Sequence, residues 1–272
     1  MATVEVTSWA EFVEAAGTSG ADVVLPENAV WDMNEIQPHF NQNLSISCDS
    51  ITGNGTEIKN LHITGYIGIS GTAVTGLKMT NILADGSGGG SDVYKKGLIY
   101  GSGFPVLDQC VFSGIAGGGY YYMLACPGNR NITLQYCAFN LDMQGGNGVQ
   151  YEGYHKMKAS RVFLSLPTMS GTVRLANHSD TGTNMNNEYV INAPLASSVA
   201  FDANPSCTLR GNLQNVTSIH FDSSADVSVY NAEDAPNASV SGNSAARLIG
   251  VTDEQMKSAA YLQSIGFVIA GA

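Results

Sequence analysis

Charged residues are scarce in this 272-residue chain, where Asp, Glu, Lys and Arg together make up 13%. That is about half the share of a typical soluble domain. No apolar run reaches the roughly 18 residues that a membrane-spanning helix needs. The first residues also lack the basic and apolar regions of a signal peptide. We therefore expect that the chain is made in the cytoplasm, is not exported through a signal peptide and does not insert into a membrane.

The five cysteines include no C-x-x-C pair, which argues against a zinc site and a disulfide framework. Cys110 and Cys137 stand within apolar strand patterns and are interpreted as small hydrophobic residues. The glycine-rich segment 85–92 lacks the acidic alternation of a calcium loop and is interpreted as a turn. We expect no metal and no cofactor. The formal net charge of −11 disfavours nucleic acid as a partner.

Glycine is plentiful, with 31 residues, and short strand patterns separated by turn residues dominate the chain. Several segments share one pattern: an apolar residue, a polar turn step, and an alternating apolar pair that ends in Asn, Ser, Thr or Gly. They are residues 58–65, 74–81, 106–113, 132–140 and 157–165. Phe112 and Phe139 lie 27 positions apart, and Phe139 and Phe163 lie 24 apart. Periods of this length indicate a repeat architecture.

The repeat spacing varies too much for a leucine-rich repeat and is too short for a propeller. A β-helix tolerates loops of variable length, because each turn stacks only through its inward strands. The sequence therefore predicts an all-β, single-domain, right-handed parallel β-helix with short capping α-helices at both ends. In it, Cys110 would lie over Cys137 and Phe112 over Phe139. Further strands are expected at residues 188–193, 207–216, 218–222 and 226–231.

Two capping boxes mark the expected terminal helices. Ser8 and Glu11 open a helix that carries Trp9 and Phe12 and ends at Gly17. A second box at residues 252–255 opens a helix over residues 256–262. We divide the chain into an N-terminal capping strand and helix (1–20), the parallel β-helix (21–250), and a C-terminal capping helix and tail (251–272). With both ends covered, we expect a complete unit.

Three segments carry a family resemblance: residues 4–12, residues 30–34 leading into 51–61, and residues 251–267. Together they resemble a type of parallel β-helix protein found among bacteriophage and prophage structural proteins. The resemblance implies a virion component, associated with the tail or the virion surface, whose partners are other virion proteins. It carries no catalytic signature and therefore transfers no active-site residues. A homotrimer is expected, because trimers are common among phage β-helix proteins.

Polysaccharide lyases and glycoside hydrolases also use β-helices, so a depolymerase is the alternative function. Acid–base cleavage needs two carboxylates at a defined separation, and the sequence contains no Asp-Asp pair. The remaining catalytic candidates are Glu152 and His155, together with Asp180 near His178. The sequence thus leaves enzymatic activity open and favours a non-catalytic role. His39, His62 and His220 are isolated in the sequence and receive no role.

Tyrosines supply the stronger candidates for ligand binding, because exposed aromatic rings suit sugar rings or a protein partner. Tyr120, Tyr121 and Tyr122 follow three glycines, and Tyr151 and Tyr154 lie on a neighbouring predicted turn of the repeat. These five residues are the candidate contacts to a host-surface glycan. The alternative is that every second tyrosine points inward and fills the interior.

Overall fold

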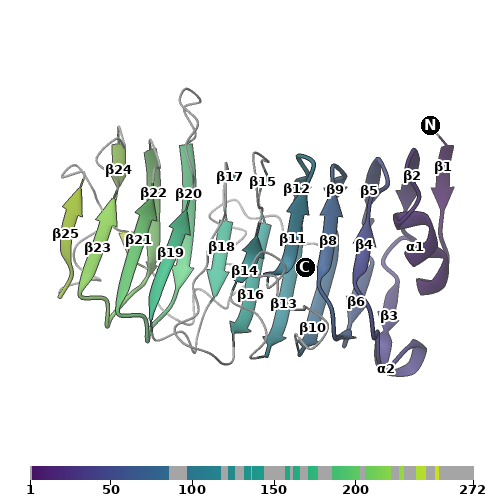
Figure 1. Ribbon diagram of the computed structural model, residues 1–272, viewed down its shortest axis with the longest axis horizontal. Coiled ribbons are helices and arrows are strands. Elements are labelled where there is room, and N and C mark those ends of the chain that lie inside the picture. Colours follow the sequence, from purple (N-terminus) through teal and green to yellow (C-terminus); the bar gives the residue numbers. More distant parts are fainter. Residues whose placement is uncertain are drawn as a thin grey trace.

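Parallel β-strands make up most of the residues that the structure describes. The computed structural model describes residues 2–85, 97–117, 122–125, 132–135, 137–143, 157–159, 162–165, 171–176, 186–202, 206–221, 227–229, 237–242 and 249–250. Every strand pair within these segments runs parallel. The predicted all-β class is therefore confirmed. Figure 1 shows the strands side by side along the long axis, from β1 at one end to β25 at the other.

The strands form four sheets, which we name A to D. Sheet A has the order β1 (Ala2–Glu5), β2 (Ala21–Val24), β5 (Ser50–Thr52), β9 (Ala73–Thr75), β12 (Val106–Asp108), β15 (Ile132–Gln135) and β17 (Met157–Ala159). Sheet C has the order β4 (Leu44–Ile46), β8 (Ile67–Ser70), β11 (Gly97–Ser102) and β14 (Tyr122–Ala125). Sheet D has the order β19 (Thr172–Ala176), β21 (Ser198–Asp202), β23 (Ser218–Phe221) and β25 (Ser239–Gly242).

Sheet B has the most strands and extends from β3 to β24. Its order is β3 (Val30–Asp32), β6 (Glu57–Lys59), β10 (Lys78–Ala84), β13 (Val111–Ala116), β16 (Cys137–Met143), β18 (Val162–Ser165), β20 (Asn186–Asn192), β22 (Ser206–Asn212) and β24 (Val227–Val229). Two short strands join it from the side, β7 (His62–Ile63) on β10 and β26 (Ile249–Gly250) on β22.

The chain visits the sheets in a repeating order. From β2 to β14 it passes through sheets A, B and C four times in succession, and from β20 onward it alternates between sheets B and D. In sheet A, Ile51 pairs with Val74, 23 positions later, and Val74 pairs with Leu107, 33 positions later. In sheet B, Asn192 pairs with Asn212, 20 positions later. The repeat is therefore variable in length, and the pairings among β20 to β25 shorten it to 20 or 21 positions.

Inward side chains of neighbouring strands stack in register and form the core. In sheet A, one buried column contains Val23, Ile51, Val74 and Leu107. In sheet B, the buried column contains Trp31, Ile58, Met79, Phe112 and Phe139. A column of this kind removes apolar surface from water on every strand that it crosses, and this burial is the main force that holds the stack together.

The predicted stacking of Phe112 on Phe139 is confirmed. The two residues pair in register, both are fully buried, and their rings are stacked with centroids 5.6 Å apart and planes 7° apart. Cys110 and Cys137 immediately precede the paired residues Val111 and Ala138, so they share the same register. Both thiols are fully buried, as expected for small hydrophobic residues.

Two parts of the predicted repeat alignment are wrong. Phe139 pairs with Leu164, whereas Phe163 pairs with Ala138. Residues 162–164 are all apolar, so the sequence did not specify which of them faces inward, and a shift of one residue exchanges the two faces of a strand. Likewise, Ile58 pairs with Met79 and not with Val74, because β6 belongs to sheet B and β9 to sheet A.

The N-terminal helix α1 (Trp9–Ala16) lies at the first end of the stack (Figure 1). The predicted capping box is present, since the Glu11 N–H donates to Ser8 Oγ at 3.4 Å and Glu11 Oε2 accepts from the Thr7 N–H at 2.7 Å. Trp9 and Phe12 are buried, and their rings contact Phe40 and Trp31 respectively, with centroids 5.5 and 5.9 Å apart. The helix thus covers the apolar end of the columns with aromatic rings.

The expected C-terminal helix lies outside the described residues, as do the segments around Glu152, His155 and Asp180.

Replacing Phe112 by Ala removes one ring from the continuous column and leaves a cavity beneath Phe139. We expect the free energy of unfolding to fall by about 3–5 kcal/mol, measured by urea denaturation. Leu195→Ala is the control, because this side chain is 50% exposed and its loss should change stability by no more than about 0.5 kcal/mol. Equal effects of the two substitutions would contradict the column as the source of stability.

Candidate functional site

The sequence-predicted site residues are not brought together within the described part of the chain. Tyr120, Tyr121, Tyr151 and Tyr154 lie outside it, as do the catalytic candidates Glu152, His155 and Asp180. Tyr122 begins β14, where its backbone pairs with Gly97. A connected group of polar side chains that the structure does place lies on the outward face of sheet B, next to the N-terminal end.

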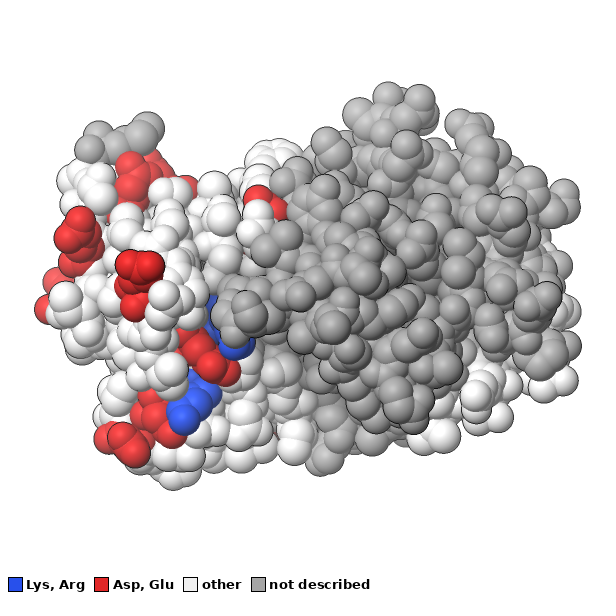
Figure 2. Space-filling model, turned by 180° about the vertical axis from the view of Figure 1, so that it is seen from behind, with Lys and Arg blue, Asp and Glu red and all other residues white. Residues whose placement is uncertain are grey.

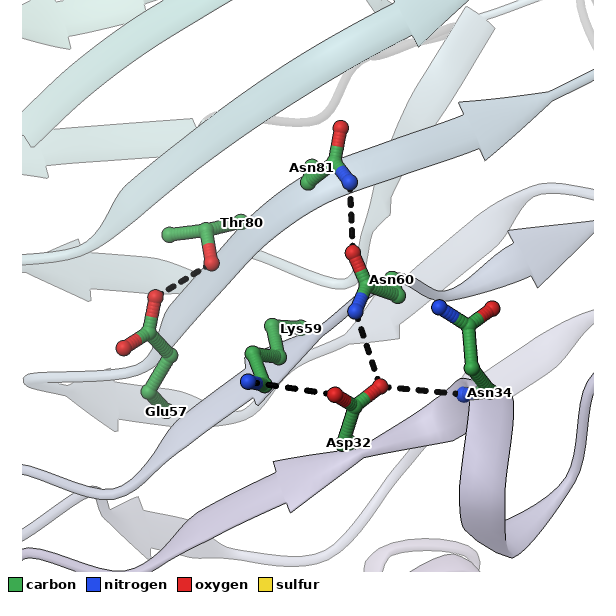
Figure 3. Close-up of polar contacts among 7 residues, drawn as sticks. All are labelled: Asp32, Asn34, Glu57, Lys59, Asn60, Thr80 and Asn81. Atoms are coloured by element: carbon green, nitrogen blue, oxygen red, sulfur yellow. Dashed lines mark hydrogen bonds and ion pairs between the residues drawn. The ribbon is translucent and has the colours of Figure 1, made fainter.

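Asp32 is the centre of a polar network on this face (Figure 3). Lys59 Nζ lies 3.1 Å from Asp32 Oδ2, and Asn60 Nδ2 donates to Asp32 Oδ1 at 2.8 Å. The Asn34 N–H donates to the same Oδ1 at 3.2 Å, so that Asp32 is the N-cap of the short helix α2 (Met33–Ile36). One carboxylate thus connects β3, the following helix and the neighbouring strand β6.

Two asparagines continue the network at the bend that follows these strands. Asn60 and Asn81 have left-handed backbones, with φ of 61° and 50°. Asparagine is one of the few residues other than glycine that tolerates this conformation. Asn81 Nδ2 donates to Asn60 Oδ1, and Asn60 Nδ2 in turn donates to Asp32, so the hydrogen bonds run in series across the sheet (Figure 3). The bend is therefore repeated at the same place on consecutive strands.

Glu57 forms the second half of the network. It lies directly between Val30 and Lys78 in the register of sheet B. Its Oε2 lies 3.5 Å from Lys78 Nζ, and its Oε1 accepts a hydrogen bond from the Thr80 hydroxyl. Both carboxylates of this face are consequently engaged by groups on the next strand, and each is paired with one lysine.

Hydrogen bonding keeps the central carboxylate ionised. The hydrogen bond from the Asn60 amide, followed by that from Lys59, lowers the pKa of Asp32 from its ordinary value of 3.8. A general acid in glycoside cleavage needs the opposite shift, toward neutral pH. Asp32 is thus suited to holding strands together and not to donating a proton.

Acidic side chains accumulate toward the N-terminal end of the molecule. Residues 1–85 contain ten Asp and Glu but only two basic residues, Lys59 and Lys78. Figure 2 shows these acidic groups over the part of the surface formed by the N-terminal elements. Because both lysines are paired with carboxylates, this end presents a negative field.

His39 and His62, for which the sequence pattern predicts no role, are brought together. Their ring centroids lie 4.6 Å apart, and His62 Nε2 lies 3.6 Å from Asp85 Oδ2. Their spacing could have predicted this contact, because they are 23 positions apart, the same interval as the paired residues Ile51 and Val74. His39 directly precedes Phe40 and His62 directly precedes Ile63, so the parallel bridge between Phe40 and Ile63 brings the two histidines side by side.

The described residues contain no group of three or more His, Cys, Asp or Glu side chains that could hold a metal ion. Burial raises the pKa of the Cys48 thiol to about 11 and that of Cys110 well above its usual value. Both thiols therefore stay protonated at neutral pH and are poor nucleophiles. In the described segments, no helix is sufficiently long and apolar to span a bilayer.

Asn60→Gly and Asn60→Ala separate the two roles of this asparagine. Both remove the hydrogen bonds to Asp32 and Asn81, but Ala also places a Cβ in the left-handed region. We expect Asn60→Ala to lower the free energy of unfolding by about 1 kcal/mol more than Asn60→Gly. Asn34→Ala serves as the control, because only its backbone joins the network. Equal stability of the Gly and Ala variants in urea denaturation would argue against a strained bend.

The lowered pKa of Asp32 predicts a specific pH dependence. A carboxyl group with a lower pKa in the folded state stabilises the fold above its unfolded value, here about 3.8, and this contribution is lost as the pH falls further. We expect Asp32→Asn to reduce the urea midpoint at neutral pH and to weaken its decline toward about pH 3. Glu27→Gln removes a charge from an exposed turn as the control. If the urea midpoint of Asp32→Asn fell toward pH 3 as steeply as that of the natural chain, Asp32 would not be the source of this pH dependence.

No protein-family model, curated protein or solved structure matches this chain.

Proposed function

We propose that the chain forms a right-handed parallel β-helix in which each passage through sheets A, B and C is one turn. Three observations support this architecture: the exclusively parallel pairing of the described strands, the repeated order of sheets, and the in-register inward columns. The left-handed asparagines at one bend of consecutive strands also fit a turn that recurs at each level of a helix.

We further propose that this β-helix is a structural protein of a phage virion, located at the tail or the virion surface. One observation favours a structural role over a catalytic one. Asp32 is paired with Lys59, and Glu57 with Lys78, each across two consecutive strands. Carboxylates committed to such pairs hold this face rigid and are not free to act there as an acid–base pair for cleavage. The resemblance of residues 4–12, 30–34, 51–61 and 251–267 to phage β-helix proteins provides the virion setting.

In this role the chain assembles as a homotrimer with other virion proteins and contacts a host-surface glycan. The net charge of −11 makes nucleic acid an unfavourable partner. The low charge content of the remaining surface suits lateral packing between copies, since few charges have to be desolvated.

Particles purified from cells that carry the gene should contain this chain as a stoichiometric component, measured by quantitative mass spectrometry. The recombinant chain should sediment as a trimer at micromolar concentration. Absence from purified particles would contradict the virion assignment, and a monomer in sedimentation would remove the trimer.

The depolymerase alternative is tested on the same preparations by measuring reducing ends released from host polysaccharide, with Glu152→Ala as the control. Release by the natural chain and its loss in the variant would replace the structural assignment by an enzymatic one.

A further inference from the structure

Two tyrosine rings lie together on the outward face of sheet C. Tyr66 directly precedes β8, and Tyr100 lies in β11, the next strand of the sheet. Their ring centroids are 5.5 Å apart with planes inclined by 53°, and both side chains are partly exposed. The alternate positions Ile67 and Ile99 pair with each other and are fully buried, which places the tyrosines on the outer side of the sheet.

Gly68 makes room for this aromatic pair. It is the register partner of Tyr100 and stands two positions after Tyr66 on the same face. A Cβ added at Gly68 would lie 3.0 Å from Cε2 of Tyr66, so the Tyr66 ring lies directly over the glycine backbone. The other neighbours of Tyr100 in this row are small, Ser45 beyond Gly68 and Ala125 on β14. The register partners of Tyr100 on the strands to either side are therefore small residues.

Hydroxyl groups extend the row along the strand, and a third aromatic residue follows at the next corner of the chain. Ser70 and Ser102 are paired in register, two positions after Gly68 and Tyr100, about 7 Å farther along the strand. Phe104 follows at the corner between β11 and β12, with a left-handed backbone (φ 66°) and 59% of its surface exposed. A bulky residue in this conformation at an exposed position is strained, and such strain is concentrated at functional sites.

We propose that Tyr66, Tyr100, Ser70, Ser102 and Phe104 form a binding strip for an uncharged saccharide. The faces of tyrosine and phenylalanine rings provide flat apolar contact for the C–H faces of sugar rings, and the serine hydroxyls between them exchange hydrogen bonds with sugar hydroxyls. None of these five side chains carries a charge at neutral pH, and the net charge of −11 repels anionic glycans. The assignment rests on the proposed function in so far as the saccharide belongs to a host surface.

The probes are immobilised neutral oligosaccharides (malto-, cello- and chito-oligosaccharides) and sulfated or carboxylated oligosaccharides of similar length. The full-length protein should bind at least one neutral series and none of the anionic ones. Tyr66→Ala and Tyr100→Ala should each raise the Kd about tenfold or more, whereas Tyr100→Phe should retain most of the affinity because it keeps the ring face.

Gly68→Val provides an independent variant, because its side chain displaces the Tyr66 ring without removing an aromatic residue. It should weaken binding as much as Tyr66→Ala, while Val30→Ala on sheet B should leave binding unchanged. Melting temperatures of all variants identify any loss of binding that results from unfolding. Gly68→Val therefore keeps the test decisive if Tyr66→Ala does not fold.

Binding to anionic oligosaccharides alone, no binding to any member of the panel, or unchanged neutral binding in folded Tyr100→Ala and Gly68→Val would overturn the strip. Incorporation of the same variants into particles is measured in parallel. Normal incorporation with no saccharide binding refutes the strip but not the structural role, whereas absence of the natural chain from particles refutes the structural role.

Discussion

Hydrogen bonding between parallel strands about 4.8 Å apart is the constraint on which the rest of this molecule depends. Apart from β1 and β2, which are joined through α1, each described strand pairs only with strands that precede or follow it by at least one passage through the sheets. Inward residues consequently stack on residues some 20 to 33 positions away. The ring of Phe112 on that of Phe139 is the clearest case. The core therefore consists of columns of stacked side chains. The aromatic rings of α1 cover these columns at the N-terminal end of the molecule.

The same spacing organises polar residues on the outside. Asp32, Asn60 and Asn81 belong to three neighbouring strands, and each binds the next through its side chain. Since the carboxylates of this face have partners on the adjacent strand, they stabilise the stack and are withdrawn from acid–base chemistry. The proposed recognition site lies on a different sheet, at the tyrosine pair next to Gly68 on sheet C.

Sequence reasoning succeeded where the local pattern carried a physical requirement. The capping box at Ser8 and Glu11 predicted the helix that begins at Trp9, because a helix start needs acceptors for its free N–H groups. A polar turn step is expected in each repeated segment, and in residues 74–81, 106–113, 132–140 and 157–165 it falls between a strand of sheet A and a strand of sheet B. It failed at residues 162–164, where three consecutive apolar residues satisfy either face of the strand.

The sequence by itself determined that the chain is β-rich and repetitive, where its first helix begins, and that Cys110 and Cys137 are apolar core residues. Only the tertiary structure decided which residues become neighbours. His39 lies beside His62, and Tyr66 beside Tyr100, because the intervening loops set the register, and loops of different length are accommodated without disturbing the stack. One additional residue within a strand would exchange its two faces, whereas ten in a loop would not. Contacts between strands therefore depend on the summed length of each turn, which local sequence patterns do not reveal.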